Sequence, residues 1–263
     1  MNSEASSRAA TNRVLTAFYT TVRAGQMRLS DGGGPFGFDI QTALQIDYLI
    51  REFACDGVVE TGTFLGDTAD YLACAYPDLP VRTCEIDPAH AAVARRRLDR
   101  HENANLIVGD SAALLPGLLD GLRRPLVYLD AHWEKAWPLS RELAAVTTGV
   151  VAIDDFDIGH QRFGFDVYDG TVCGPGLVHD ALPTLEHLYV GDPEADYPLP
   201  CLQVGRRSGT GYLTRGLDQS RIGASPLFRA VPLLPQVVMP TWLTSPSTAQ
   251  PTTARPVTVE GAR

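Results

Sequence analysis

The chain shows two patterns of hydrophobic and polar positions, one typical of buried strands and one typical of amphipathic helices. Between residues 57 and 155, short runs rich in Val, Leu and Ile are separated by stretches in which apolar residues recur at helical spacing. The runs are predicted to be buried parallel strands, which are apolar throughout, and the stretches between them to be helices with one polar face. The predicted strands are 58–60, 81–85, 106–108, 126–129 and 150–153, and the predicted helices are 67–76, 88–101, 111–120 and 138–147.

This alternation predicts an α/β fold with a doubly wound, mostly parallel sheet, because parallel neighbours need crossover helices. A helix near 178–187 and two later apolar runs, near 188–190 and 211–214, are expected to give a seven-stranded sheet with an antiparallel edge. Two helices, 8–24 and 39–54, precede the first strand. The expected organisation is an N-terminal helical cap (1–56), an α/β domain (57–239) and a disordered tail (240–263) dominated by Pro, Thr, Ser and Ala.

Segment 156–180 interrupts the alternation. It is rich in Gly, Asp and aromatic residues and contains Gly174-Pro175-Gly176. A loop of this length inside a compact domain is usually functional or disordered. We expect it to close over a ligand as a lid and to be disordered without one.

Composition narrows the range of partners. The 263 residues include 31 acidic and 22 basic side chains, for a net charge of −9, which argues against a nucleic-acid surface. No apolar run approaches about 18 residues, and no secretory leader is visible, so a cytoplasmic protein without a membrane segment is expected. The five cysteines are scattered without CxxC spacing and are expected to be free thiols.

The first predicted strand runs into a glycine-containing turn, Glu60-Thr-Gly62-Thr-Phe-Leu-Gly66, and the second ends at Glu85. Gly62 and Gly66 let the backbone approach a ligand closely, and Glu85 could bind both hydroxyls of a ribose. The close G-x-G-x-x-G spacing of a pyrophosphate site is missing, and Glu60 would repel a phosphate. A cationic nucleoside such as S-adenosylmethionine, with its sulfonium and amino groups, suits Glu60 better. The alternative is a tight turn with a solvated Glu.

Three segments together resemble the successive cofactor motifs of class I S-adenosylmethionine-dependent methyltransferases. They are VVETGTFLG at 58–66, CEIDP at 84–88 and GDS at 109–111. The resemblance implies a Rossmann-like methyltransferase fold with the methionine end near Glu60, the ribose at Glu85 and the adenine near Asp110 and Ser111. Asp110 could equally cap the helix that follows it. The cofactor-binding set implied in this way is Glu60, Thr61, Gly62, Thr63, Gly66, Glu85, Asp110, Ser111 and Asp130.

Three carboxylates follow two neighbouring predicted strands. Asp130 comes after the fourth strand, and Asp154 and Asp155 come after the fifth. Like charges held close together are costly unless a cation neutralises them or a proton is shared. Carboxylate oxygens favour Mg²⁺, which could bind a substrate hydroxyl and lower its pKa. Asp residues at strand ends can also serve only to cap loops.

The segment after the fourth strand is similar to metal-dependent O-methyltransferases of the catechol and macrocin types. That similarity implies that Asp130, Asp154 and Asp155 are metal ligands and that His132 is a candidate base. A catalytic Lys follows the Trp of the catechol pattern, whereas Glu134 stands there in this sequence. Lys135, one place further on, is therefore a second candidate. His132 could also have only a packing role.

These observations favour an S-adenosylmethionine-dependent O-methyltransferase, Mg²⁺-assisted, acting on a hydroxyl of a small molecule. The acceptor is expected to be a sugar or phenol in natural product biosynthesis. One alternative is a metal-independent O- or N-methyltransferase that uses His132, and another is a non-catalytic nucleoside-binding module of the same fold. The N-terminal helices could cover the pocket or pair two subunits as a homodimer.

Overall fold

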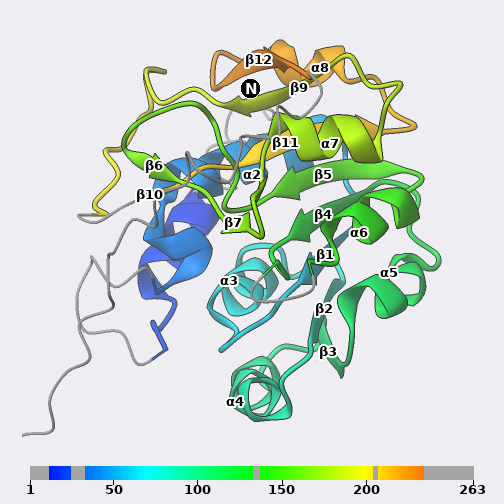
Figure 1. Cartoon of the computed structure of the whole chain (residues 1–263). Coiled ribbons are helices and arrows are strands. Elements are labelled where there is room, and N and C mark those ends of the chain that lie inside the picture. Colours follow the sequence, from blue (N-terminus) through cyan, green and yellow to red (C-terminus); the bar gives the residue numbers. More distant parts are fainter. Residues whose placement is uncertain (1–11, 25–32, 133–136, 204–206, 234–263) are drawn as a thin grey trace, which may run out of the picture.

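The computed structural model describes residues 12–24, 33–132, 137–203 and 207–233 (Figure 1). Within them, one sheet crosses the molecule with helices on both of its faces. The tail 240–263 and the candidate base Lys135 lie outside the described residues.

The sheet has eight strands in the order β12-β9-β11-β5-β4-β1-β2-β3. Neighbours from β3 to β5 are parallel, whereas β11 runs antiparallel to β5 and β9, and β12 runs antiparallel to β9. The strands are β1 (Gly57–Thr61), β2 (Val81–Glu85), β3 (Ala104–Val108), β4 (Pro125–Leu129), β5 (Gly149–Ile153), β9 (His187–Gly191), β11 (Gly211–Arg215) and β12 (Phe228–Pro232). The doubly wound α/β prediction is confirmed.

The predicted count of seven strands omits β12. Its sequence, Phe-Arg-Ala-Val-Pro, contains a charge and a proline, so it lacks the apolar run of a central strand. Among the described residues, the strand lies at the end of the sheet and pairs with β9 alone. Proline is tolerated in such an edge strand because its missing N–H need not face a neighbour.

Capping residues set the ends of several helices. The Asp87 carboxylate accepts a hydrogen bond from Ala89 N at 2.7 Å, and that of Asp110 accepts one from Ala112 N at 3.0 Å. A helix was expected near 178–187. The structure instead has α7 at Pro175–Ala181, which begins at a proline because proline suits the first turn of a helix. Besides residues 12–20, the described helices are α2 (Ile40–Glu52), α3 (Asp67–Ala75), α4 (Pro88–Leu98), α5 (Ser111–Leu119), α6 (Leu139–Ala145), α7 (Pro175–Ala181), α8 (Ser220–Gly223) and the 3₁₀ turn η2 (Pro35–Phe38).

Each face of the sheet carries its own apolar core, because successive side chains of a strand point to opposite faces. Val58 and Val150 pack with the N-terminal helices and α3 on one face, whereas Val59 and Val151 pack with α5, α6 and α7 on the other. The N-terminal helices therefore share a core with the sheet. None of the helices among the described residues combines the length and apolar character needed to cross a membrane.

Segment 156–180 was expected to be disordered without a ligand, but it contains short strands. β7 (Val167–Tyr168) pairs with β8 (Thr171–Val172), and β6 (Phe163–Gly164) pairs with β10 (Arg207–Ser208). Backbone hydrogen bonds tie the segment to the end of β5: Asp166 N donates to Asp155 O at 2.9 Å. Closure of this segment over an acceptor stays a prediction.

Candidate active site

The turn after β1 lies tightly between its two neighbouring strands. Gly62 has φ +79°, and a Cβ there would lie 2.2 Å from the backbone oxygen of Asp130. The N–H groups of Gly62 and Thr63 both donate to Cys84 O, at 3.0 and 3.1 Å. A side chain at position 62 would therefore push β1 and β4 apart. Gly66 has a different neighbour, since its Cβ would lie 3.1 Å from that of Ala94 on α4.

Glu60 is a buried carboxylate, only 1% exposed, so the alternative of a solvated Glu is wrong. Its Oε2 accepts a hydrogen bond from the Thr83 hydroxyl at 2.6 Å, and that hydroxyl also contacts the Thr63 hydroxyl. Burial raises the pKa of Glu60 to about 8, with the Glu85 and Asp67 carboxylates adding to the shift and the Thr83 hydroxyl opposing it. A nearby cation would favour the charged form.

Glu85 is held in place by the backbone. Its Oε2 accepts from Phe64 N at 2.7 Å, and its Oε1 accepts from Asp87 N at 2.9 Å. The neighbouring apolar side chains of Ile86 and Phe64 are 70% and 52% exposed, although large apolar groups are usually buried. These two apolar side chains were not among the candidates from the sequence. Their position within the two cofactor motifs could have identified them.

Asp110 caps α5, as the alternative interpretation had it, and its second oxygen lies 3.4 Å from Arg141 Nη1. Ser111, next in the chain, is buried. Beneath it lies Glu142 of α6, a fully buried carboxylate with no hydrogen-bond partner among the described residues. Burial raises the pKa of Glu142, while the nearby hydroxyls of Ser111 and Thr61 act in the opposite direction. Sequence reasoning missed Glu142, whose signal was its position three residues after Leu139, on the buried side of α6.

Asp130, His132 and Asp155 come together at the ends of β4 and β5. Each offers one ligand atom, and these atoms lie within 4.8 Å of one another in the described part of the chain. Burial raises the pKa of Asp130 well above its usual value, and the nearby Asp154 and Asp155 carboxylates raise it further. The Ser208 hydroxyl donates to Asp155 Oδ1.

The expected third metal ligand, Asp154, lies outside this group. Its Oδ1 is 3.5 Å from the Thr210 hydroxyl, and burial and Asp155 raise its pKa well above the usual value. His132 is 2% exposed, and neither of its ring nitrogens has a hydrogen-bond partner among the described residues. Burial lowers the pKa of His132, and Asp155 and the backbone of Asp154 oppose this shift only in part. The second candidate base, Lys135, cannot be placed in the site, since it lies outside the described residues.

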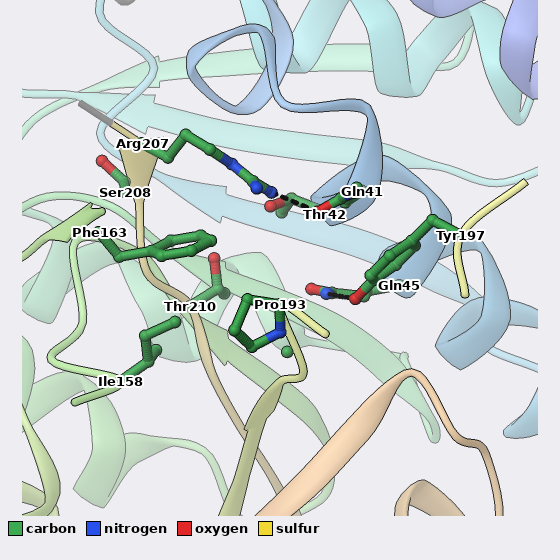
Figure 2. Close-up of a pocket in the computed structure, with 11 residues that line it drawn as sticks. Gln41, Thr42, Gln45, Ile158, Phe163, Pro193, Tyr197, Arg207, Ser208 and Thr210 are labelled. Carbon is green, nitrogen blue, oxygen red and sulfur yellow. Dashed lines mark hydrogen bonds between the residues drawn. The ribbon is translucent and has the colours of Figure 1, made fainter. Parts of the chain in front are cut away.

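A small polar pocket adjoins these acids (Figure 2). It lies between α2, which contributes Gln41 and Gln45, and the chain around β10. Arg207 is buried there, with its Nε 2.5 Å from Asp39 Oδ2 and its guanidinium over the ring of Phe163. Its charge is therefore balanced within the protein. Because Ser208 and Thr210 line the pocket and also contact Asp155 and Asp154, the pocket wall lies against the acids.

Comparison with known proteins shows which known fold this chain shares. No family model matches the sequence, and no curated protein is similar enough to count as a relative. Among solved structures, SAH-bound methyltransferase PaMTH1 of Podospora anserina is 14% identical with a TM-score of 0.50, over 83% of this chain and 97% of that one. The chain has the fold of the class I methyltransferases.

Two further solved structures are similar at lower TM-scores. The O-methyltransferase TomG of Streptomyces achromogenes, involved in tomaymycin synthesis and solved with SAM, is 22% identical with a TM-score of 0.45, over 67% of this chain and 80% of that one. Cofactor-bound Rv0187 from MTB is 19% identical with a TM-score of 0.44, over 79% of this chain and 90% of that one.

In a doubly wound methyltransferase fold, the ligand crevice lies beyond the carboxyl ends of the strands, where the strand order reverses. Here the reversal falls between β1 and β4. The turn at Gly62 follows β1, Glu85 ends β2, and Asp130 and Asp155 follow β4 and β5. Candidate residues for the nucleoside and for the reacting end thus share one edge of the sheet.

Proposed function

We propose that this protein is an S-adenosylmethionine-dependent O-methyltransferase that acts, with a divalent ion, on a hydroxyl of a small molecule. The observation that carries the proposal is the arrangement at the carboxyl edge. The buried Glu60 and the anchored Glu85 lie on the same edge as the Asp130-His132-Asp155 group. A cationic nucleoside and an acceptor hydroxyl could therefore meet there in an orientation suited to reaction.

The residues present fit the nucleoside. Among the described residues, the groups that act on Glu60 are the Thr83 hydroxyl and the Glu85 and Asp67 carboxylates, none of which is a cation. Glu60 therefore suits the positively charged methionine end of the cofactor. Each carboxylate oxygen of Glu85 accepts one backbone hydrogen bond, and each has a further lone pair that a ribose hydroxyl could use. The exposed side chain of Ile86 offers an apolar surface to the adenine ring, beside Asp110 and Ser111.

The residues also fit a divalent ion. Asp130 and Asp155 come from neighbouring strands, and the raised pKa of Asp130 reflects the cost of holding buried carboxylates together without a cation. An ion bound there would supply a positive charge that lowers the pKa of the acceptor hydroxyl. The predicted ion is Mg²⁺, on the basis of the carboxylate ligands.

The reaction would be an in-line displacement. The acceptor oxygen forms a bond to the methyl carbon while the bond from that carbon to sulfur breaks, and the electron pair stays on sulfur. The hydroxyl proton passes to a basic group at this edge, for which His132 and Lys135 are the candidates from the sequence. The acceptor predicted from the sequence is a hydroxylated molecule, such as a sugar or a phenol of a natural product.

Isothermal titration with S-adenosylhomocysteine tests the part of the proposal that concerns nucleoside binding. We expect one molecule bound per chain, and Glu60→Gln to weaken the binding of S-adenosylmethionine more than the binding of S-adenosylhomocysteine, which lacks the sulfonium charge. Glu102→Gln, at an exposed position, is the matched control. Absence of nucleoside binding by a folded protein would refute the proposed function.

Methyl transfer to a panel of sugars and phenols, with and without EDTA, tests the reacting half. Turnover that EDTA abolishes and added divalent ion restores supports metal assistance. Turnover that persists in EDTA would favour the metal-independent alternative. Nucleoside binding without transfer to any acceptor would favour a binding module.

A further inference from the structure

The group at the ends of β4 and β5 combines one nitrogen ligand with two oxygen ligands. Asp130 and Asp155 each contribute a carboxylate oxygen, and His132 contributes a ring nitrogen, all within 4.8 Å of one another. The sequence predicted three carboxylates, but Asp154 lies outside this set, with its carboxylate toward Thr210. The donor chemistry of the group therefore differs from the one expected.

His132 provides the independent evidence that this group binds a ligand. The residue is 2% exposed, and both Nδ1 and Nε2 lack a hydrogen-bond partner among the described residues. The large majority of buried polar side-chain atoms have such a partner, because leaving one unsatisfied is costly. The edge contact of His132 with Trp137, 5.8 Å between ring centroids, satisfies neither nitrogen. The backbone of Asp154 lies nearby but makes no well-formed hydrogen bond with the ring. A bound metal ion would satisfy one of them.

The carboxylate of Asp155 is also held as metal ligands usually are. The Ser208 hydroxyl donates to one of its oxygens, and the Asp155 backbone oxygen accepts from Asp166 N. Partners of this kind fix the orientation of a ligand carboxylate and are typical of metal sites.

We propose that His132, Asp130 and Asp155 together hold a first-row transition ion of the Mn²⁺ type in preference to Mg²⁺. Imidazole nitrogen favours transition ions, carboxylates suit Mg²⁺, Ca²⁺ and Mn²⁺, and Mn²⁺ accepts both kinds of ligand. His132 is then a metal ligand and not the general base. The inference rests on the proposed function for the role of the ion, but the binding of the ion can be measured separately.

The test is a titration of Mn²⁺ into metal-free protein, followed by electron paramagnetic resonance, with Mg²⁺ as competitor. We expect one Mn²⁺ per chain, bound on the order of tenfold or more tightly than Mg²⁺. Pulsed measurements on the bound ion should show coupling to a ¹⁴N nucleus, and that coupling should change to ¹⁵N in protein grown with ¹⁵N-histidine. This comparison uses the unaltered sequence and does not depend on how a variant folds.

Variants assign the nitrogen to one residue. His132→Ala should lose the nitrogen coupling and weaken Mn²⁺ binding at least about tenfold, while the matched control His187→Asn, at the start of β9, should change neither. Circular dichroism checks that both variants fold. Bound Mn²⁺ without nitrogen coupling, coupling retained in His132→Ala, tighter binding of Mg²⁺, or no Mn²⁺ binding would each overturn the proposal. S-adenosylhomocysteine binding, measured on the same samples without metal, reports separately on the proposed function.

Discussion

The nucleoside end and the reacting end of the site lie on one edge of the sheet but are built differently. At the nucleoside end, each acid has partners within the protein: two backbone N–H groups for Glu85 and the Thr83 hydroxyl for Glu60. At the reacting end, His132 has no hydrogen-bond partner among the described residues, and neighbouring carboxylates raise the pKa of Asp130. Hydrogen bonds preorganise the nucleoside end. At the reacting end the Ser208 hydroxyl also donates to Asp155, but the carboxylates still repel one another, and a cation would relieve this repulsion.

The largest expected effect concerns the turn that joins the two ends. Gly62→Ala places a Cβ 2.2 Å from the backbone oxygen of Asp130 at a left-handed φ. We expect it to lower the free energy of unfolding by about 3 kcal/mol or more and to abolish nucleoside binding. Chemical denaturation and titration calorimetry measure both.

The control is Gly117→Ala in α5, where a Cβ would meet nothing within 4 Å. It should raise the free energy of unfolding by about 0.5–1 kcal/mol, because alanine is the better helix former. If Gly62→Ala had the same free energy of unfolding as the wild type, this result would contradict the close approach of β1 and β4.

A second substitution distinguishes the reacting end of the site, where the metal is proposed to bind, from the nucleoside end. Asp155→Asn should weaken metal binding at least about a hundredfold and leave S-adenosylhomocysteine affinity nearly unchanged. It should also stabilise the metal-free protein by on the order of 1 kcal/mol, because the Asp155 charge raises the pKa of Asp130 and Asp154. Denaturation with and without Mn²⁺ measures this, and Asp157→Asn is the control. Destabilisation of the metal-free protein would show that the reacting end is preorganised after all.

A smaller effect is expected at the apolar rim of the nucleoside end. Ile86→Ala should weaken S-adenosylhomocysteine binding roughly tenfold, because about two methylene groups lose their contact with adenine. Stability should barely change, since the side chain is 70% exposed. Ile107→Ala, on the neighbouring edge strand, is the control for calorimetry. Equal affinities of the two variants would place the adenine elsewhere.

The last effect is a pH dependence. Burial raises the pKa of Glu60 from its ordinary value of 4.5 to about 8 in the folded protein. Its neutral form is therefore favoured by folding, and this contribution to stability is complete below about pH 4.5 and is lost as the pH rises through about 8. Glu60→Gln should flatten stability across this range.

Binding of S-adenosylmethionine should release a fraction of a proton near pH 7, because a cationic ligand favours the charged form of Glu60. Calorimetry in buffers with different ionisation enthalpies measures this release. No release from the wild type would argue against a cation beside Glu60.

The sequence predicted the fold well where burial controls the pattern. Strands β1, β4 and β5 are buried at every position and have the apolar sequences of buried strands, and β2 is buried at all but one position. Asp87 and Asp110 mark helix starts. Edge strand β12 was missed because only one side of it is paired, so its composition is less restricted. The position of α7 was misjudged because Pro175 was read as a loop residue and not as a helix start.

The candidate site was predictable in part. Strand order alone brings Asp130 and Asp155 to one edge, since both follow neighbouring parallel strands. That the ligand atoms of His132, and not those of Asp154, gather with Asp130 and Asp155 depends on side-chain directions after β5, where Asp155 has φ +45°. No sequence pattern reports these directions, and the role of Asp154 as a metal ligand stays a prediction. Glu142 was missed because a Glu on a short amphipathic helix is usually solvated.

The hydrogen bond from Asp166 N to Asp155 O joins segment 156–180 to a residue of the reacting end. Any exchange of that segment for one from another protein would also reposition Asp155. If segment 156–180 contacts the acceptor, as the sequence predicts, then selectivity for the acceptor and the position of Asp155 are inherited together in this chain.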